Sequence, residues 1–157
     1  MKVILPGSYD PVTLGHLDLI ERAAAEHNEV YAVIFINPEK KYTFSAEERL
    51  HMLSLATAHL SNVTVDFYGG YVVDYMKEKS IDKIIKGYRS EIDLEYEKKQ
   101  AEYNFSHGGY QTELYRSSDS LSEVSSTLAR ECISKGESLS GILPESVAEY
   151  IKQKSDN

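Results

Sequence analysis

Short runs of apolar residues recur along the chain, and a longer segment that mixes apolar with charged residues follows each of them. The runs are rich in valine and isoleucine, as expected of strands that are buried on both faces of a parallel sheet. The run over 30–36 is apolar throughout. The predicted strands span 3–5, 30–36, 63–67, 83–86 and 113–115.

The intervening segments carry apolar residues every three or four positions, which predicts amphipathic helices. Ser45 with Glu48 three residues later forms a capping box that begins the second helix. Gly136 is typical of the residue that ends a helix, and Pro144 of the first turn of one. The predicted helices span 17–25, 45–59, 71–79, 94–105, 125–136 and 144–153.

This alternation of strands and helices predicts an α/β fold with a doubly wound, mostly parallel sheet and helices on both faces. We find no internal repeat or low-complexity linker, so we expect one domain over 1–157. The stretch 106–109, which contains two glycines, is expected to form a flexible loop. Folds of this class bind ligands at the carboxyl ends of their strands, so the residues just after each strand are the first functional candidates.

Composition narrows the classes of function. The formal net charge of −8 argues against a broad nucleic-acid surface. Cys132 is the single cysteine, so no intrachain disulfide can form, which fits a reducing cytoplasm. No apolar run approaches the roughly 20 residues of a membrane span, and the N-terminal run is too short for a signal peptide. We expect a soluble, cytoplasmic protein that binds neither membrane nor nucleic acid.

The segment between the first predicted strand and the first predicted helix holds the strongest candidate chemistry. Over residues 7–16 it reads Gly-Ser-Tyr-Asp-Pro-Val-Thr-Leu-Gly-His. Gly7 permits close approach of the backbone to a ligand, and Ser8 offers a hydroxyl and an N–H. His16 lies at the first turn of a helix, where free N–H groups and the helix dipole favour an anion. These parts suit a triphosphate, although a tight loop with a capping histidine would use the same residues.

This segment resembles the signature of the nucleotidyltransferase superfamily. Its Thr-x-Gly-His form, the short chain and the motifs downstream are similar to bacterial phosphopantetheine adenylyltransferases over nearly the whole length. The resemblance implies a Rossmann-like nucleotidyltransferase fold. It also implies that His16 binds the ATP phosphates and stabilises the pentacovalent transition state. Ser8 stands where the family usually has threonine, and is expected to touch both the acceptor phosphate and ATP.

Lysines follow the second predicted strand, at Lys40 and Lys41. A lysine at this end of a strand can meet a phosphate as a point charge, and a solvated basic turn is the alternative. The resemblance implies a catalytic and substrate-binding role for Lys40. Lys41 is the candidate if the register of the loop shifts by one residue.

Two cations flank a glycine after the fourth predicted strand, in Lys86-Gly87-Tyr88-Arg89. Such a pair at a strand end can hold two phosphates. The family usually reads Arg-Gly-x-Arg here, so Arg89 matches a catalytic ligand of the ATP phosphates. Lys86 departs from the pattern, and lysine cannot fork onto a phosphate as arginine does. The identity of the acceptor therefore depends on what Lys86 contacts.

Three further segments gain roles mainly from the resemblance. Glu97, in a charged helix, matches a residue that contacts the nucleotide, and Val72 matches a contact to the pantetheine arm; without the family, both would be an ordinary solvated or core residue. Val124-Ser125-Ser126-Thr127 opens a helix, where hydroxyls can cap the helix or bind an anion. The implied ATP-binding residues are Ser8, Tyr9, His16, Gly87, Tyr88, Arg89, Glu97, Val124, Ser125, Ser126 and Thr127; the implied substrate-binding residues are Ser8, Lys40, Val72 and Lys86.

The resemblance implies transfer of the adenylyl group of ATP to 4′-phosphopantetheine, giving dephospho-coenzyme A and pyrophosphate. Mg²⁺ would be bound through the ATP phosphates and not in a protein cage, and the five histidines and Cys132 show no zinc-ligand spacing. The family usually forms a homo-hexamer, and dephospho-coenzyme A or coenzyme A would bind as product or regulator. Two alternatives stay open. One is an adenylyltransferase with another acceptor such as nicotinamide mononucleotide, and the other is an inactive paralogue that binds nucleotide.

Overall fold

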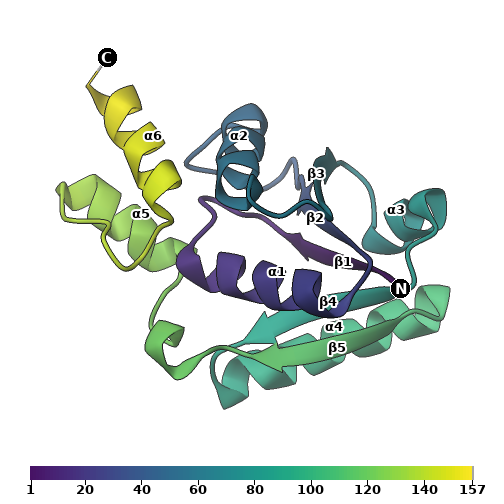
Figure 1. Cartoon of the computed structure of the whole chain (residues 1–157). Coiled ribbons are helices and arrows are strands. Elements are labelled where there is room, and N and C mark those ends of the chain that lie inside the picture. Colours follow the sequence, from purple (N-terminus) through teal and green to yellow (C-terminus); the bar gives the residue numbers. More distant parts are fainter. Residues whose placement is uncertain (157) are drawn as a thin grey trace.

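The computed structural model describes residues 1–156, so Asn157, the last residue of the predicted domain, lies outside the described residues. Residues 1–156 form a sheet of five parallel strands with helices packed on both faces (Figure 1). Every predicted strand is confirmed, and most are longer than the apolar run that predicted them. The strands are β1 (Lys2–Gly7), β2 (Glu29–Phe35), β3 (Val63–Tyr68), β4 (Lys83–Tyr88) and β5 (Gln111–Arg116).

The predicted helices are also confirmed, together with the capping box and the glycine that ends a helix; Pro144 is the N-cap of the last helix, one position before the first turn in which it was predicted. Ser45 and Glu48 form the expected capping box, and Gly136 ends its helix with φ of 69°. The flexible loop predicted over 106–109 is wrong, because α4 continues through Gly108 and Gly109 closes it with an N–H bond to Phe105 O. The helices are α1 (Leu14–Glu26), α2 (Ala46–Thr57), α3 (Val72–Lys79), α4 (Glu91–Gly108), the short 3₁₀ helix η1 (Asp119–Leu121), α5 (Ser126–Lys135) and α6 (Glu145–Ser155).

The strand order explains where a ligand can bind. The order is β3-β2-β1-β4-β5, with every neighbouring pair parallel. The chain winds outward from β1 to β3, then crosses back to β4 on the other side of β1. Helices leave neighbouring strands in opposite directions at such a reversal, so a crevice opens beyond the carboxyl ends of β1 and β4.

Alternating side chains of β1 anchor two cores. Val3 and Leu5 pack with α1, α2, α5 and α6 on one face of the sheet. Ile4 packs on the other face with Ile84 of β4 and the α3 residues Tyr75 and Met76. Figure 1 shows α1 in front of the sheet and α4 behind β4 and β5. The predicted doubly wound architecture is therefore confirmed, and both cores hold the carboxyl ends of the central strands in place.

Within residues 1–156, no helix combines the length and the apolar character that crossing a membrane requires.

Candidate active site

Three adjoining cavities lie at the carboxyl ends of β1 and β4, and Ser8 lines all of them. We name each after one of its residues: the His16 cavity of about 380 Å³, the Glu97 cavity of about 290 Å³ and the Lys40 cavity of about 390 Å³. Lys86 also lines both the His16 and the Glu97 cavities, and Ser126 lines both the His16 and the Lys40 cavities. Groups bound in neighbouring cavities would therefore meet beside Ser8.

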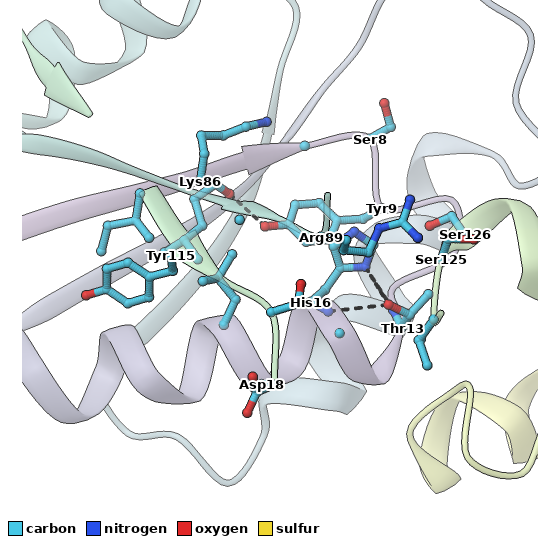
Figure 2. Close-up of a pocket in the computed structure, with 18 of the residues that line it drawn as sticks. Ser8, Tyr9, Thr13, His16, Asp18, Lys86, Arg89, Tyr115, Ser125 and Ser126 are labelled. Atoms are coloured by element: carbon cyan, nitrogen blue, oxygen red, sulfur yellow. Dashed lines mark hydrogen bonds between the residues drawn. The ribbon is translucent and has the colours of Figure 1, made fainter. Parts of the chain in front are cut away.

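The His16 cavity collects residues from segments far apart in the sequence (Figure 2). Its walls come from the loop after β1, the first turns of α1, the end of β4 and the start of α5. Most of the predicted ATP-binding residues line it: Ser8, Tyr9, His16, Gly87, Arg89, Val124, Ser125, Ser126 and Thr127.

Buried contacts fix the loop after β1. Tyr9 has a positive φ of 48°, a conformation that side chains other than glycine seldom adopt. It is held there because its ring is buried and its hydroxyl donates to Leu5 O at 2.7 Å. The ring also explains Gly7, since a Cβ at that position would come within 3.1 Å of the Tyr9 ring. The turn therefore brings the backbone of Ser8 to the cavity, and the preceding residue, Gly7, has no side chain that would collide with the Tyr9 ring.

Asp10 joins this loop to two other segments. Its buried carboxylate accepts bonds from the N–H groups of Thr43 and Phe44, at 2.8 and 2.9 Å. Its backbone carbonyl accepts a bond from Arg130 Nη1 of α5 at 2.8 Å. Because a buried carboxylate needs such partners, Asp10 keeps the 43–44 backbone and the start of α5 close to the cavities.

His16 is oriented by the helix that it begins. Its Nδ1 accepts a bond from the Thr13 N–H at 3.0 Å, so a neutral imidazole carries its proton on Nε2. Burial, with the nearby charges of Lys86 and Arg89, lowers the pKa of His16 from 6.5 to about 4. The ring is thus neutral near pH 7 and has one N–H to donate. The capping role and the functional role noted in the sequence are compatible, because they use different ring nitrogens.

The first turn of α5 forms the opposite wall. Ser125 Oγ accepts a bond from Leu128 N–H, and Ser126 Oγ donates to Pro11 O at 2.8 Å. Ser125 thus caps α5, and Ser126 holds the helix against the loop after β1. The free backbone N–H groups of the first turn can then face an anion in the His16 cavity.

The Lys40 cavity is cationic. Lys40, Lys41 and Arg130 line it, and Lys40 Nζ lies 3.5 Å from Ser8 Oγ. Among residues 1–156, Asp10 is its one acidic lining residue, and both carboxylate oxygens of Asp10 already accept backbone N–H groups. A phosphate in this cavity would therefore meet positive charge that is only partly neutralised by the protein.

The Glu97 cavity lies between α4 and the sheet. Lys86 Nζ is 3.8 Å from Glu97 Oε1, and the Glu97 side chain is only 13% exposed. Burial raises the pKa of Glu97, and Asp93 adds to this while Lys86 opposes it. Glu97 Oε2 is buried without a hydrogen-bond partner among residues 1–156. Phe35 and Val72 line the same cavity, and so does Thr112, whose Oγ1 is also buried without a partner among residues 1–156, so the cavity offers apolar walls and two unsatisfied polar atoms.

The structure separates some residues that the sequence had grouped. Glu97 and Val72 lie together in the Glu97 cavity, apart from the lining of the His16 cavity. Tyr88 is a described residue, but it lines none of these three cavities. Its carbonyl accepts a bond from Ser117 N–H. The predicted contacts of Glu97 and Tyr88 with a nucleotide stay predictions.

Some residues of the site were given no role by the sequence. Asp10 belongs to the 7–16 motif but was assigned no role there. Its position directly before the proline of the motif was the one sequence feature that could have indicated a structural role. Arg130 and Tyr42 had no signal of their own, because their partners lie 120 and 5 residues away. Arg49, just after the capping box of the second helix, was given no role; it lies behind the cavities, where it is buried and bonds to Ser8 O.

The arrangement can hold two ligands that each carry phosphate. The His16 cavity offers N–H donors and cations, and the Glu97 cavity offers apolar walls that end at Lys86 and Ser8. A phosphate at the end of the second ligand would lie beside a phosphate of the first. This geometry suits group transfer between phosphates, for which positioning and charge are the main requirements.

Comparison with known proteins agrees with this geometry. The family model described as cytidylyltransferase-like matches residues 4–132. A phosphopantetheine adenylyltransferase of Corynebacterium efficiens is 44% identical over 155 residues, which cover 98% of this chain and 98% of the relative. A phosphopantetheine adenylyltransferase of Corynebacterium glutamicum strain R is 42% identical over 158 residues, covering 100% and 99%. The chain therefore belongs to the cytidylyltransferase-like family of nucleotidyltransferases and, within it, to the phosphopantetheine adenylyltransferases.

Proposed function

We propose that this chain transfers the adenylyl group of ATP to 4′-phosphopantetheine, forming dephospho-coenzyme A and pyrophosphate. The observation that carries the proposal is the meeting of the His16 and Glu97 cavities at Ser8 and Lys86. The full-length similarity to proteins named phosphopantetheine adenylyltransferase supports the choice of acceptor.

We place ATP in the His16 cavity. The neutral His16 would donate its Nε2–H to the α-phosphate, and Arg89 would pair with the phosphates beyond it. Arg89 is half-exposed and bonded only loosely, with its Nη1 3.4 Å from Ser122 O, so it can turn toward a ligand. The first-turn N–H groups of α5 would add donors that are already oriented before ATP binds.

We place the pantetheine arm in the Glu97 cavity. Val72 and Phe35 would contact its apolar part, and the unsatisfied Oε2 of Glu97 would accept an amide N–H or a hydroxyl. The terminal phosphate would then reach Lys86 and Ser8. Lysine in place of the arginine usual in the family suffices here, because the Glu97 carboxylate already sets the direction of the Lys86 ammonium group.

The reaction needs no protein nucleophile. An ionised oxygen of the acceptor phosphate attacks the α-phosphorus, a P–O bond forms, and the bond to the departing pyrophosphate breaks. Negative charge builds on the oxygens of the α-phosphate and on the leaving group. His16 and Lys40 would stabilise that charge, and the cations of the Lys40 cavity would hold the pyrophosphate.

Magnesium, assembly and location are part of the proposal. Residues 1–156 hold no group of three or more His, Cys, Asp or Glu side chains placed to bind a metal, and Asp18 is the carboxylate that lines the His16 cavity. These residues fit an ion that arrives bound to ATP phosphates, where it neutralises phosphate charge. An interface with a partner subunit is supported by the exposed Ile92, Tyr96 and Phe105 of α4, and we propose that the assembly is the homo-hexamer usual in the family. Coenzyme A as a regulator and a cytoplasmic location stay predictions.

The test is pyrophosphate release from ATP and Mg²⁺, measured in parallel with 4′-phosphopantetheine, with nicotinamide mononucleotide and with no acceptor. Of these three reactions, we expect pyrophosphate release only in the one that contains 4′-phosphopantetheine. Release only with nicotinamide mononucleotide would reassign the acceptor. Absence of release, together with ATP binding, would show an inactive paralogue and refute the proposal.

A further inference from the structure

Arg49 of α2 is a buried charge that the proposed reaction does not use. It is 2% exposed, and within the described residues it lines none of the three cavities. Its Nη1 donates to Ser8 O at 3.0 Å, whereas its Nε is buried without a partner among residues 1–156. Burying a guanidinium that is only partly hydrogen-bonded destabilises the fold, so its presence here calls for a physical role.

Tyr42 is the second contact of Arg49. The guanidinium carbon lies 3.9 Å from the centroid of the Tyr42 ring, which is close stacking for a cation on an aromatic face. The Tyr42 hydroxyl accepts a bond from Asn37 N–H at 3.1 Å and so closes the 37–42 loop. Lys40 Nζ lies 5.5 Å from the centroid of the same ring. Tyr42 thus links the buried Arg49 to the lysine at the cavity.

Both ends of this chain of contacts converge on one residue. Arg49 holds the backbone carbonyl of Ser8, and Lys40 Nζ lies 3.5 Å from the Ser8 hydroxyl. Ser8 lines all three cavities. The guanidinium plane therefore sets where the Ser8 backbone lies and, through the Tyr42 ring, where the 37–42 loop presents Lys40.

We propose that Arg49, stacked on Tyr42, is a positioning residue for adenylyl transfer, holding Lys40 and Ser8 in the mutual arrangement that the transition state requires. The inference rests on the proposed function. Arginine suits the role because its planar group can stack and donate a directed hydrogen bond at once, which the ammonium of lysine cannot do. Misplacement of a catalytic group by about 1 Å can cost on the order of 100-fold in rate.

The test separates positioning from stability by using Tyr42, which is half-buried and outside the hydrophobic core clusters. Tyr42→Leu removes the ring, and Tyr42→Phe keeps the ring but removes the hydroxyl. We expect Tyr42→Leu to lower kcat by about 10- to 100-fold with the KM for ATP changed by less than about threefold. Tyr42→Phe should restore kcat to within about threefold of the wild type, because the stack remains and the exposed Asn37 N–H can bond to water in place of the hydroxyl.

A double-mutant cycle shows whether the effect passes through Lys40. In a Lys40→Ala background, Tyr42→Leu should lower kcat by less than about twofold, because the group that it positions is already gone. Arg49→Lys keeps the charge and loses the stack; because Arg49 also bonds to Ser8 O, only the part of its effect that passes through Tyr42 should vanish in the Lys40→Ala background. If the Arg49 variant does not fold, the Tyr42 cycle decides alone. The inference would be overturned if Tyr42→Leu lowered kcat equally in the wild-type and Lys40→Ala backgrounds, or if it left kcat unchanged in the wild-type background.

Lys79→Ala is the matched control. Lys79 faces the Tyr75 ring at 6.0 Å near the amino ends of the strands, where its carbonyl accepts a bond from Lys2. Removing this cation from an aromatic ring should leave kcat unchanged.

Failure of the proposed function would be seen first, as wild-type protein that forms no product from phosphopantetheine. The positioning inference is then tested by crystal structures of the wild type and Tyr42→Leu. Lys40 Nζ beside Ser8 in the first and displaced in the second supports it, and the same Lys40 position in both overturns it.

Discussion

The loop over residues 7–16 and helix α4 flank the same junction, but they are built in different ways. Tyr9, Asp10, Val12 and Thr13 of the loop are buried, and their polar groups are paired within the protein. In the described part of the chain, none of the 18 residues of α4 is buried. Segments with few buried apolar contacts open more easily. The nucleotide side is therefore preorganised, whereas the acceptor side depends more on its ligand and on neighbouring subunits.

The largest expected effect falls on the preorganised side. His16→Ala removes a donor that is oriented before ATP binds, and kcat should fall by about 10²- to 10³-fold. The thermal unfolding temperature should fall only modestly, because the Thr13 N–H loses its partner at His16 Nδ1 while the hydrophobic core clusters are untouched. Steady-state kinetics with His51→Ala, an exposed histidine of α2, provide the control. Near-normal kcat in His16→Ala would contradict the role of the loop.

Asp10→Asn weakens the hydrogen bonds that hold the loop, and its effect is read out as stability in the absence of substrate. The amide can replace only one of the two acceptor oxygens facing Thr43 and Phe44, so one buried N–H meets another N–H. We expect the free energy of unfolding in urea to fall by about 1–3 kcal/mol. The exposed Asp82, which accepts one backbone bond from Lys2, is the control. An equal loss in Asp82→Asn would show that burial of the loop is not the cause.

Acid should destabilise the loop through His16. Its pKa is lowered from 6.5 in the unfolded chain to about 4 in the folded one, so between these pH values the unfolded chain binds the extra proton. Stability is therefore fully present above about pH 6.5 and is lost as the pH falls toward about 4. We would compare urea unfolding of the wild type and His16→Asn across this range. A difference in stability that does not vary with pH would contradict the neutral, buried imidazole.

The smallest expected effect is on the acceptor side. Lys86→Arg should lower the KM for phosphopantetheine or leave it unchanged, because arginine can fork onto the phosphate and still pair with Glu97. Initial rates at saturating ATP measure this KM, and the KM for ATP is the internal control. A sharp rise in the acceptor KM would mean that the pocket is fitted to lysine, and would direct attention to another acceptor.

The two regions also differ in how far the sequence could predict them. The strands around the 7–16 loop follow from continuous apolar runs, and the motif itself places Ser8 and His16 at a strand end. Those features are local. The side of α4 that faces the sheet is not a local feature. No residue of α4, a helix that the structure describes in full, is buried, so the helix has no apolar stripe from which to predict that side. Glu97 was assigned to the nucleotide by the family resemblance alone. The structure places it beside Lys86, and its contact with a nucleotide stays a prediction.

Arg49 shows a second limit. Within its own segment it reads as one more charged residue after a capping box. Its burial depends on Ser8, which lies 41 residues away, and on the stacking of Tyr42. Local periodicity does not contain either contact, so only the folded chain reveals the link between the buried charge and Lys40.

The central claim, direct transfer between ligands that meet at Ser8, is tested by a single-turnover experiment with ATP labelled at the α-phosphorus and enzyme in excess over ATP. We expect the label to pass to dephospho-coenzyme A in step with pyrophosphate release, with none bound covalently to the protein at any time. Label retained on the protein, or found only in AMP, would contradict direct transfer at the junction of the two cavities.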